Sequence, residues 1–242
     1  MRHMLRHFVA EFIGTFALVF IGGLSYMTAQ GVNAPASVAL LILALAHGLI
    51  YGAMIGALMR VSGHFNPAVT IGFLVARRLE GMLAGVYIVA QLLGAVLASY
   101  VTKAVVPIAL FTGARGGGQV ISLNISGGQA FTLEAIATFF LVWVVFGAIT
   151  DQRPSHGVGV GVGGALAVGA TLAAAILVLA PFTGASLNPA RSLGPAVATG
   201  IFEGQIVFWT APLVGGALAG LLYDQLFLRR GPEPADHGAV EP

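Results

Sequence analysis

The stretch GASLNPARS, which runs from Gly184 to Ser192, decides the fold that this sequence predicts. Its centre, Asn188-Pro189-Ala190, has the form of a helix start, because Asn caps a helix N-terminus well and Pro suits the first helical turn. The segment before it, Leu172–Pro181, is apolar, and a single cation, Arg191, follows at once. A cation and a helix N-terminus are both costly inside an apolar region, so this stretch is a candidate functional site.

The composition indicates the surroundings of that stretch. Of the 242 residues, 57% are apolar and 8% are charged, whereas about a quarter of the residues in soluble domains are charged. The chain is therefore expected to be an integral membrane protein in contact with lipid. The net charge of +2 gives little support to a nucleic-acid partner. The absence of cysteine excludes disulfides, thiol catalysis and Cys-based metal sites, and we expect neither a cofactor nor a metal.

Six apolar segments are long enough to cross about 30 Å of hydrocarbon as helices. In chain order they are Phe8–Met27, Ser37–Leu58, Gly81–Thr102, Phe131–Ile149, Val158–Ala180 and Gly204–Phe227. Two further apolar segments, Val61–Ala76 and Pro181–Thr199, are too short to cross, and each contains an Asn-Pro-Ala helix start. Such segments enter a membrane only as re-entrant half-helices, enclosed by protein or beside a water-filled cavity. We therefore predict an all-α membrane protein with six transmembrane helices and two re-entrant half-helices.

The two halves of the chain repeat one another. Asn66-Pro67-Ala68 corresponds to Asn188-Pro189-Ala190, and the residues around Glu11 correspond, at nearly the same spacing, to those around Glu134. Each half holds three spans, which is an odd number, so the second half must lie inverted in the membrane. The two half-helices are then expected to enter from opposite faces and to meet near the midplane.

The distribution of basic residues predicts the orientation. In this topology one side of the membrane carries Arg2, Arg6, Arg60, Arg77, Arg78, Arg153, Arg229 and Arg230, and the other carries Lys103, Arg115 and Arg191. Because basic residues concentrate on the cytoplasmic side, we expect both termini in the cytoplasm and the chain in the cell membrane. Residues 1–230 are expected to form one domain, with repeat halves at about 8–106 and 130–230. The polar, Pro-rich segment Gly231–Pro242 is expected to be a disordered tail.

The two Asn-Pro-Ala motifs and their surroundings resemble those of a known family. The stretches SGHFNPAVT (Ser62–Thr70) and TGASLNPARS (Thr183–Ser192), set in six spans with an inverted repeat, are similar to those of aquaporins, in the major intrinsic protein family. The resemblance covers about Phe8 to Arg230. It implies a passive channel rather than an enzyme, with water and small neutral solutes as its partners. It also implies a homotetramer with one pore in each subunit.

The paired half-helices provide a mechanism for such a channel. Each helix N-terminus carries about half an elementary positive charge, and Asn66 and Asn188 would place amide donors in the lumen. As is understood for aquaporin-type pores, a water molecule that offers its oxygen to both amides cannot continue the hydrogen-bonded chain that proton hopping needs. The positive field repels cations as well.

The resemblance also implies an outer constriction formed by four residues, which are His47, Ile176, Ala185 and Arg191. His47 takes a position that is usually Phe in strict water channels, and Ile176 replaces a His. This set is similar to that of the plant vacuolar subgroup, whose members often pass ammonia, urea, peroxide or glycerol as well as water. Other positions match the water-channel pattern, namely Ser192, Ala196, Phe208 and Trp209. We therefore expect water as the main solute, with a facilitator of small neutral solutes as the alternative.

Three further residues have roles implied by the resemblance. His64 matches a pore-lining His near the cytoplasmic entrance. Glu11 and Glu134 match carboxylates that accept backbone N–H groups of the re-entrant loops, and a proton relay is the alternative for them.

Two other classes of protein have less support. A secondary transporter also uses inverted repeats and broken helices, but it needs a coupling site, and Glu11 and Glu134 are the only acidic residues well inside a span. An intramembrane enzyme would need metal-ligand spacing such as His-Glu-x-x-His or an activated serine, and the sequence contains neither pattern.

Overall fold

The computed structural model describes residues 2–150 and 162–228, and this part of the chain is helical without strands. Six helices are long and apolar enough to cross a membrane. They are α1 (Arg2–Gly31), α2 (Ala36–Leu58), α4 (Gly81–Val105), α6 (Gly127–Val145), α7 (Val162–Thr183) and α9 (Gln205–Tyr223). Two shorter helices, α3 (Pro67–Val75) and α8 (Pro189–Thr199), begin at the two Asn-Pro-Ala motifs. The predicted fold class is therefore confirmed.

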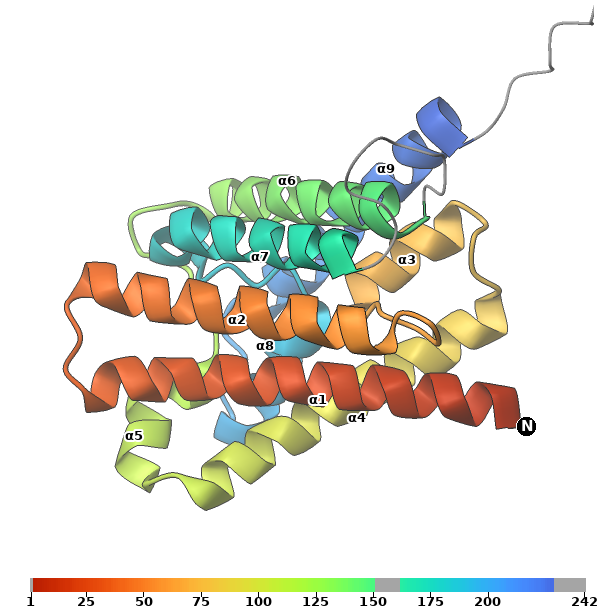
Figure 1. The fold of residues 1–242 in the computed structure, drawn as a ribbon. Coiled ribbons are helices and arrows are strands. Elements are labelled where there is room, and N and C mark those ends of the chain that lie inside the picture. The colour runs from red at the N-terminus through yellow and green to blue at the C-terminus, as the bar shows by residue number, and fades with distance from the viewer. Residues whose placement is uncertain (1, 151–161, 229–242) are drawn as a thin grey trace, which may run out of the picture.

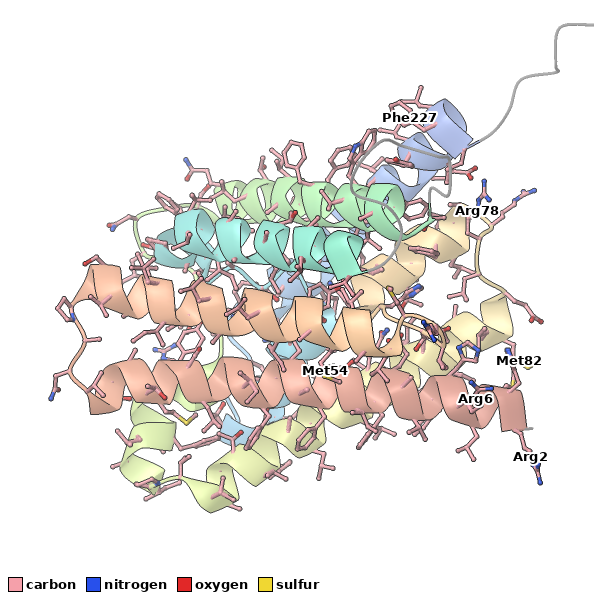
Figure 2. The ribbon with its side chains drawn as sticks, viewed as in Figure 1. Arg2, Arg6, Met54, Arg78, Met82 and Phe227 are labelled. Carbon is pink, nitrogen blue, oxygen red and sulfur yellow. The ribbon has the colours of Figure 1, made fainter. Side chains whose placement is uncertain are left out.

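The packing of the helices follows the repeat. Helix α1 packs on α4 as α6 packs on α9, and α2 and α7, the equivalent helices of the two halves, pack on each other. The short helix α3 packs on α9, and α8 packs on α4, so each half-helix lies against a long helix of the other half. The start of α1 and the end of α9 lie at the same end of the bundle (Figure 1). Arg2, Arg6 and Arg78 lie at that end too (Figure 2).

Small residues allow α2 and α7 to approach closely at the centre of the bundle. A Cβ atom added to Gly48 would lie 2.5 Å from the carbonyl oxygen of Gly169, and one added to Gly52 would lie 2.9 Å from that of Ala165. Close backbone contact of this kind drives helix association in lipid, where the hydrophobic effect does not. The outward faces carry large apolar side chains, such as Leu49 and Leu97.

The boundaries differ from the predicted ones in a few places. Helix α7 runs through Pro181 to Thr183 instead of ending at Ala180, and the hydroxyl of Thr183 donates to Glu134 Oε1 at 2.6 Å, which holds this last turn in place. The residues that lead into α3 and α8 are irregular rather than helical. The sequence did not predict the short α5 (Ile108–Gly113) and η1 (Arg115–Gly117) between the halves. The predicted fourth and sixth spans end in the single turns η2 (Phe146–Thr150) and η3 (Asp224–Leu228), which follow α6 and α9.

Some predictions lie outside the described residues. These concern the start of the fifth span at Val158, the orientation residues Arg153, Arg229 and Arg230, and the tail Gly231–Pro242.

Candidate pore

Each half-helix begins with an Asn side chain that caps it. Asn66 Oδ1 accepts from the backbone N–H of Ala68 at 2.8 Å, and Pro67 takes the first helical position. Asn188 Oδ1 accepts from the N–H groups of Ala190 at 2.9 Å and Arg191 at 3.2 Å. The local sequence explains both helix starts, because an extended Asn caps the first N–H groups and the Pro after it suits the first helical position.

The same two Asn side chains also connect the two re-entrant loops. Asn66 Nδ2 donates to the carbonyl oxygen of Leu187 at 2.8 Å, and Asn188 Nδ2 donates to that of Phe65 at 2.9 Å. Each amide group carries two N–H bonds, so one remains for a passing solute. The sequence predicted amide donors in the lumen. It did not predict that each amide uses one of its two N–H bonds on a carbonyl oxygen of the opposite loop.

Two buried carboxyl groups accept hydrogen bonds from the backbone of the re-entrant loops. Glu11 accepts from the backbone N–H groups of His64 at 2.9 Å and Phe65 at 2.7 Å, and from the side chain of Gln91 at 2.7 Å. Both oxygens of Glu11 accept hydrogen bonds and neither donates one, which is the pattern of an ionised carboxylate.

Glu134 has an equivalent set of partners in the second half. It accepts from the N–H groups of Ser186 and Leu187, both at 2.8 Å, and from the hydroxyl of Thr183. Thr183 therefore supplies the third donor that Gln91 supplies to Glu11. The sequence comparison of the halves did not reveal this equivalence, because the two donors differ in chemistry and come from different elements.

The residue before each Asn has a strained backbone. Phe65 has a φ of 48° and Leu187 a φ of 53°, and the left-handed region costs a residue with a side chain about 1–2 kcal/mol. The N–H group of each donates to a buried glutamate, and its carbonyl accepts from the Asn of the opposite loop. Each strained residue is thus held from both sides, so the conformation persists.

The four residues predicted for the outer constriction lie on α2, on α7, in the loop before α8 and in the first turn of α8. Its four predicted members are at most 2% exposed, and these are His47, Ile176, Ala185 and Arg191. Arg191 Nη1 donates to the carbonyl oxygen of Ala185 at 3.0 Å, which joins two of them directly. Ile176 is buried in the same apolar cluster as Ala185. His47 Nδ1 lies 2.7 Å from the carbonyl oxygen of Leu43, in its own helix.

Arg191 also contacts Tyr26, a residue that the sequence did not single out. Arg191 Nη2 donates to the hydroxyl of Tyr26 at 3.2 Å. The ring of Tyr26 meets that of His47 edge to face, with centroids 6.1 Å apart. Tyr26 comes from α1, where nothing in the sequence pattern set it apart from other aromatic residues.

His64 lines a cavity at the end of the bundle where Arg78 lies (Figure 2). Its backbone is held by Glu11 and by Tyr51, whose hydroxyl donates to the His64 carbonyl oxygen at 2.8 Å. Its imidazole Nδ1 lies 3.1 Å from the hydroxyl of Thr70. A cavity of about 320 Å³ opens beside it, lined among others by Ser62 and Tyr87.

A second cavity, of about 360 Å³, opens at the opposite end of the bundle and is lined among others by Tyr26, Leu43 and Gly184. The two Asn caps, Ala185 and Arg191 belong to the re-entrant loops and the first turns of α3 and α8, whereas His47 and Ile176 lie on α2 and α7. Among the described residues, no group of three or more His, Asp or Glu could hold a metal ion.

Comparison with known proteins identifies the family. The model of the major intrinsic protein family matches residues 1–223. This chain belongs to the major intrinsic protein family. Aquaporin TIP4-4 of Zea mays is 39% identical, over 96% of this chain and 92% of that protein. The lens fiber major intrinsic protein of Lithobates pipiens is 42% identical, over 91% of this chain and 81% of that protein.

A solved structure supports the same fold. The aquaglyceroporin from Plasmodium falciparum resembles this major intrinsic protein with a TM-score of 0.72 and 26% identity, over 92% of this chain and 96% of that chain. The resemblance predicted from the two Asn-Pro-Ala stretches is therefore confirmed. The chain is a multi-pass membrane channel and not an enzyme.

Proposed function

We propose that this channel conducts water passively, excludes protons and ions, and also passes small neutral solutes. The observation that carries the proposal is the reciprocal bonding of Asn66 and Asn188. Each amide uses one N–H on the opposite loop, which fixes the direction of the other N–H at the meeting point of two positive helix ends. A water molecule there accepts from both and has no way to accept a proton from its neighbour in the file.

The surroundings of the two carboxylates favour a channel over a secondary transporter. Glu11 and Glu134 each accept three hydrogen bonds, and both are fully buried. A coupling site needs a carboxylate that can bind and release an ion or a proton during the transport cycle. These two instead act as fixed supports of the re-entrant loops.

The residues of the constriction favour the passage of small neutral solutes as well as water. Ala185 is small and Ile176 is apolar, so Arg191 and His47 supply the polar contacts of the ring. Several similar proteins are plant aquaporins of the TIP type. We infer that urea, ammonia or glycerol enters alongside water. The alternative, a facilitator mainly for such solutes, is favoured by the same two residues and by the aquaglyceroporin among similar structures.

We infer that both termini lie on the cytoplasmic side of the cell membrane and that four copies assemble, each with its own pore. The placement of Arg2, Arg6 and Arg78 at the end where α1 begins supports this orientation (Figure 2). We also propose that residues 1–230 form one domain, with the two repeat halves sharing one pore.

Stopped-flow light scattering of proteoliposomes tests the function. In an impermeant osmolyte, vesicles that contain the protein should shrink faster than empty vesicles. When urea or glycerol is the osmolyte instead, they should shrink and then reswell more slowly, as the solute enters. Water flow equal to that of empty vesicles, with rapid solute entry, would favour the facilitator. A proton gradient imposed on the same vesicles should decay no faster than in empty ones.

A further inference from the structure

The guanidinium of Arg191 has few partners for so buried a cation. Arg191 is 2% exposed. Its Nη1 donates to the backbone of Ala185 and its Nη2 to the hydroxyl of Tyr26. Its Nε is buried without a partner among the described residues. Tyr26 is therefore the side chain that determines where the far end of the guanidinium lies.

Tyr26 also contacts other parts of the constriction. Its hydroxyl lies 3.5 Å from the carbonyl oxygen of Gly184, the residue before Ala185, and can donate to it while it accepts from Arg191. Its ring stands edge-on to that of His47, at an angle of 87°. One side chain thus touches the Arg, the His and the loop that carries the Ala.

The position of the ring gives Tyr26 a steric role as well. Tyr26 lines the outer cavity of about 360 Å³ together with Gly184 and Leu43. It lines this cavity and also contacts Arg191 and His47, two predicted members of the constriction. Tyr26 packs against the buried apolar cluster that includes Ala185, so its ring can supply volume that the small Ala185 side chain does not.

We propose that Tyr26 is a fifth specificity-determining residue of the outer constriction, which anchors Arg191 through its hydroxyl and limits solute size through its ring. The proposal rests on the proposed function, because it takes the four-residue constriction as the selective step. It explains how a ring with Ile176 and Ala185 still discriminates between water and larger neutral solutes.

The test compares Tyr26→Phe and Tyr26→Ala with the unaltered protein in proteoliposomes, and measures the ratio of urea to water permeability. Tyr26→Phe removes only the hydroxyl, so the ratio should rise about three- to tenfold while water permeability stays within about twofold. Tyr26→Ala also removes the ring and should raise the ratio of glycerol to water permeability above that of both the unaltered protein and Tyr26→Phe. The matched control is Tyr100→Phe, on α4, where the ring is 47% exposed on the outer face of the helix and should not matter.

A double variant separates anchoring from general disturbance. In an Arg191→Val background, Tyr26→Phe should cause no further rise in the ratio, because the hydroxyl no longer has a guanidinium to hold. Additive effects would overturn the anchoring role, and an unchanged ratio in both single variants would overturn the proposal as a whole. Failure of the proposed function looks different, since the unaltered protein would then conduct water no faster than empty vesicles.

Discussion

Replacing Glu134 with Gln should release the second re-entrant loop. Glu134 Oε1 accepts from Thr183 and Ser186, and among the described residues Oε2 accepts only from Leu187. The amide of Gln keeps most contacts if its oxygen takes the Oε1 position. Its NH₂ group then faces the N–H of Leu187, so one hydrogen bond is lost and a buried donor is left unpaired.

The cost of this change can be worked out from the contacts. An unpaired buried N–H costs about 1–3 kcal/mol. The two remaining bonds lose their charge assistance, which about halves their strength and costs about 1–3 kcal/mol together. Leu187 then relaxes from its φ of 53°, which returns about 1–2 kcal/mol. With the middle of each range, the net loss of stability is about 2–3 kcal/mol, and the movement of Leu187 also displaces the carbonyl that positions Asn66.

Two measurements on the same preparation check this prediction. Thermal unfolding in detergent, followed by tryptophan fluorescence, should begin at a lower temperature for Glu134→Gln, and stopped-flow water permeability should fall. Glu203→Gln is the control, because the Glu203 side chain is 70% exposed and its nearest cation, Arg115, is 3.5 Å away. If Glu134→Gln matches the control in both measurements, the carboxylate does not hold the loop and the reasoning fails.

Three other variants probe the constriction. Arg191→Val should raise urea permeability and ion leak by removing the charge and widening the ring, and selectivity like that of the unaltered protein would refute its assignment. His47→Phe combined with Ile176→His should lower glycerol flux relative to water, and a glycerol flux that does not fall would show that these positions are misassigned. Gly22→Ala would place a Cβ 2.6 Å from His47 Cδ2, so the ring must turn, at a cost of about 1–3 kcal/mol and with a changed urea-to-water ratio. Gly85→Ala, where a Cβ meets nothing within 4 Å, serves as its control, and equal behaviour of the two would contradict the packing argument.

The sequence predicted the architecture because the features that determine it are local. Apolar length defines the spans, Asn-Pro marks each half-helix start, and the repeat relates the halves. The contacts that hold the pore are not local, since Asn66 bonds Leu187, and Tyr26 bonds Arg191. No periodicity or motif reports a hydrogen bond between residues more than a hundred positions apart. Tyr26 in particular looks like any aromatic residue of an apolar helix until α1 and the second loop are brought together.

The bonds between the two loops have a consequence for how the protein comes to be folded. The carboxylate of Glu11 can hold Phe65 as soon as the first half is inserted, because both belong to that half. The NH₂ group of Asn66 has no acceptor in its own half among the described residues, and it donates to Leu187, which is synthesised later, in the second half. Neither half can therefore finish its own part of the pore. We therefore expect a chain that ends before Leu187 to form no conducting pore.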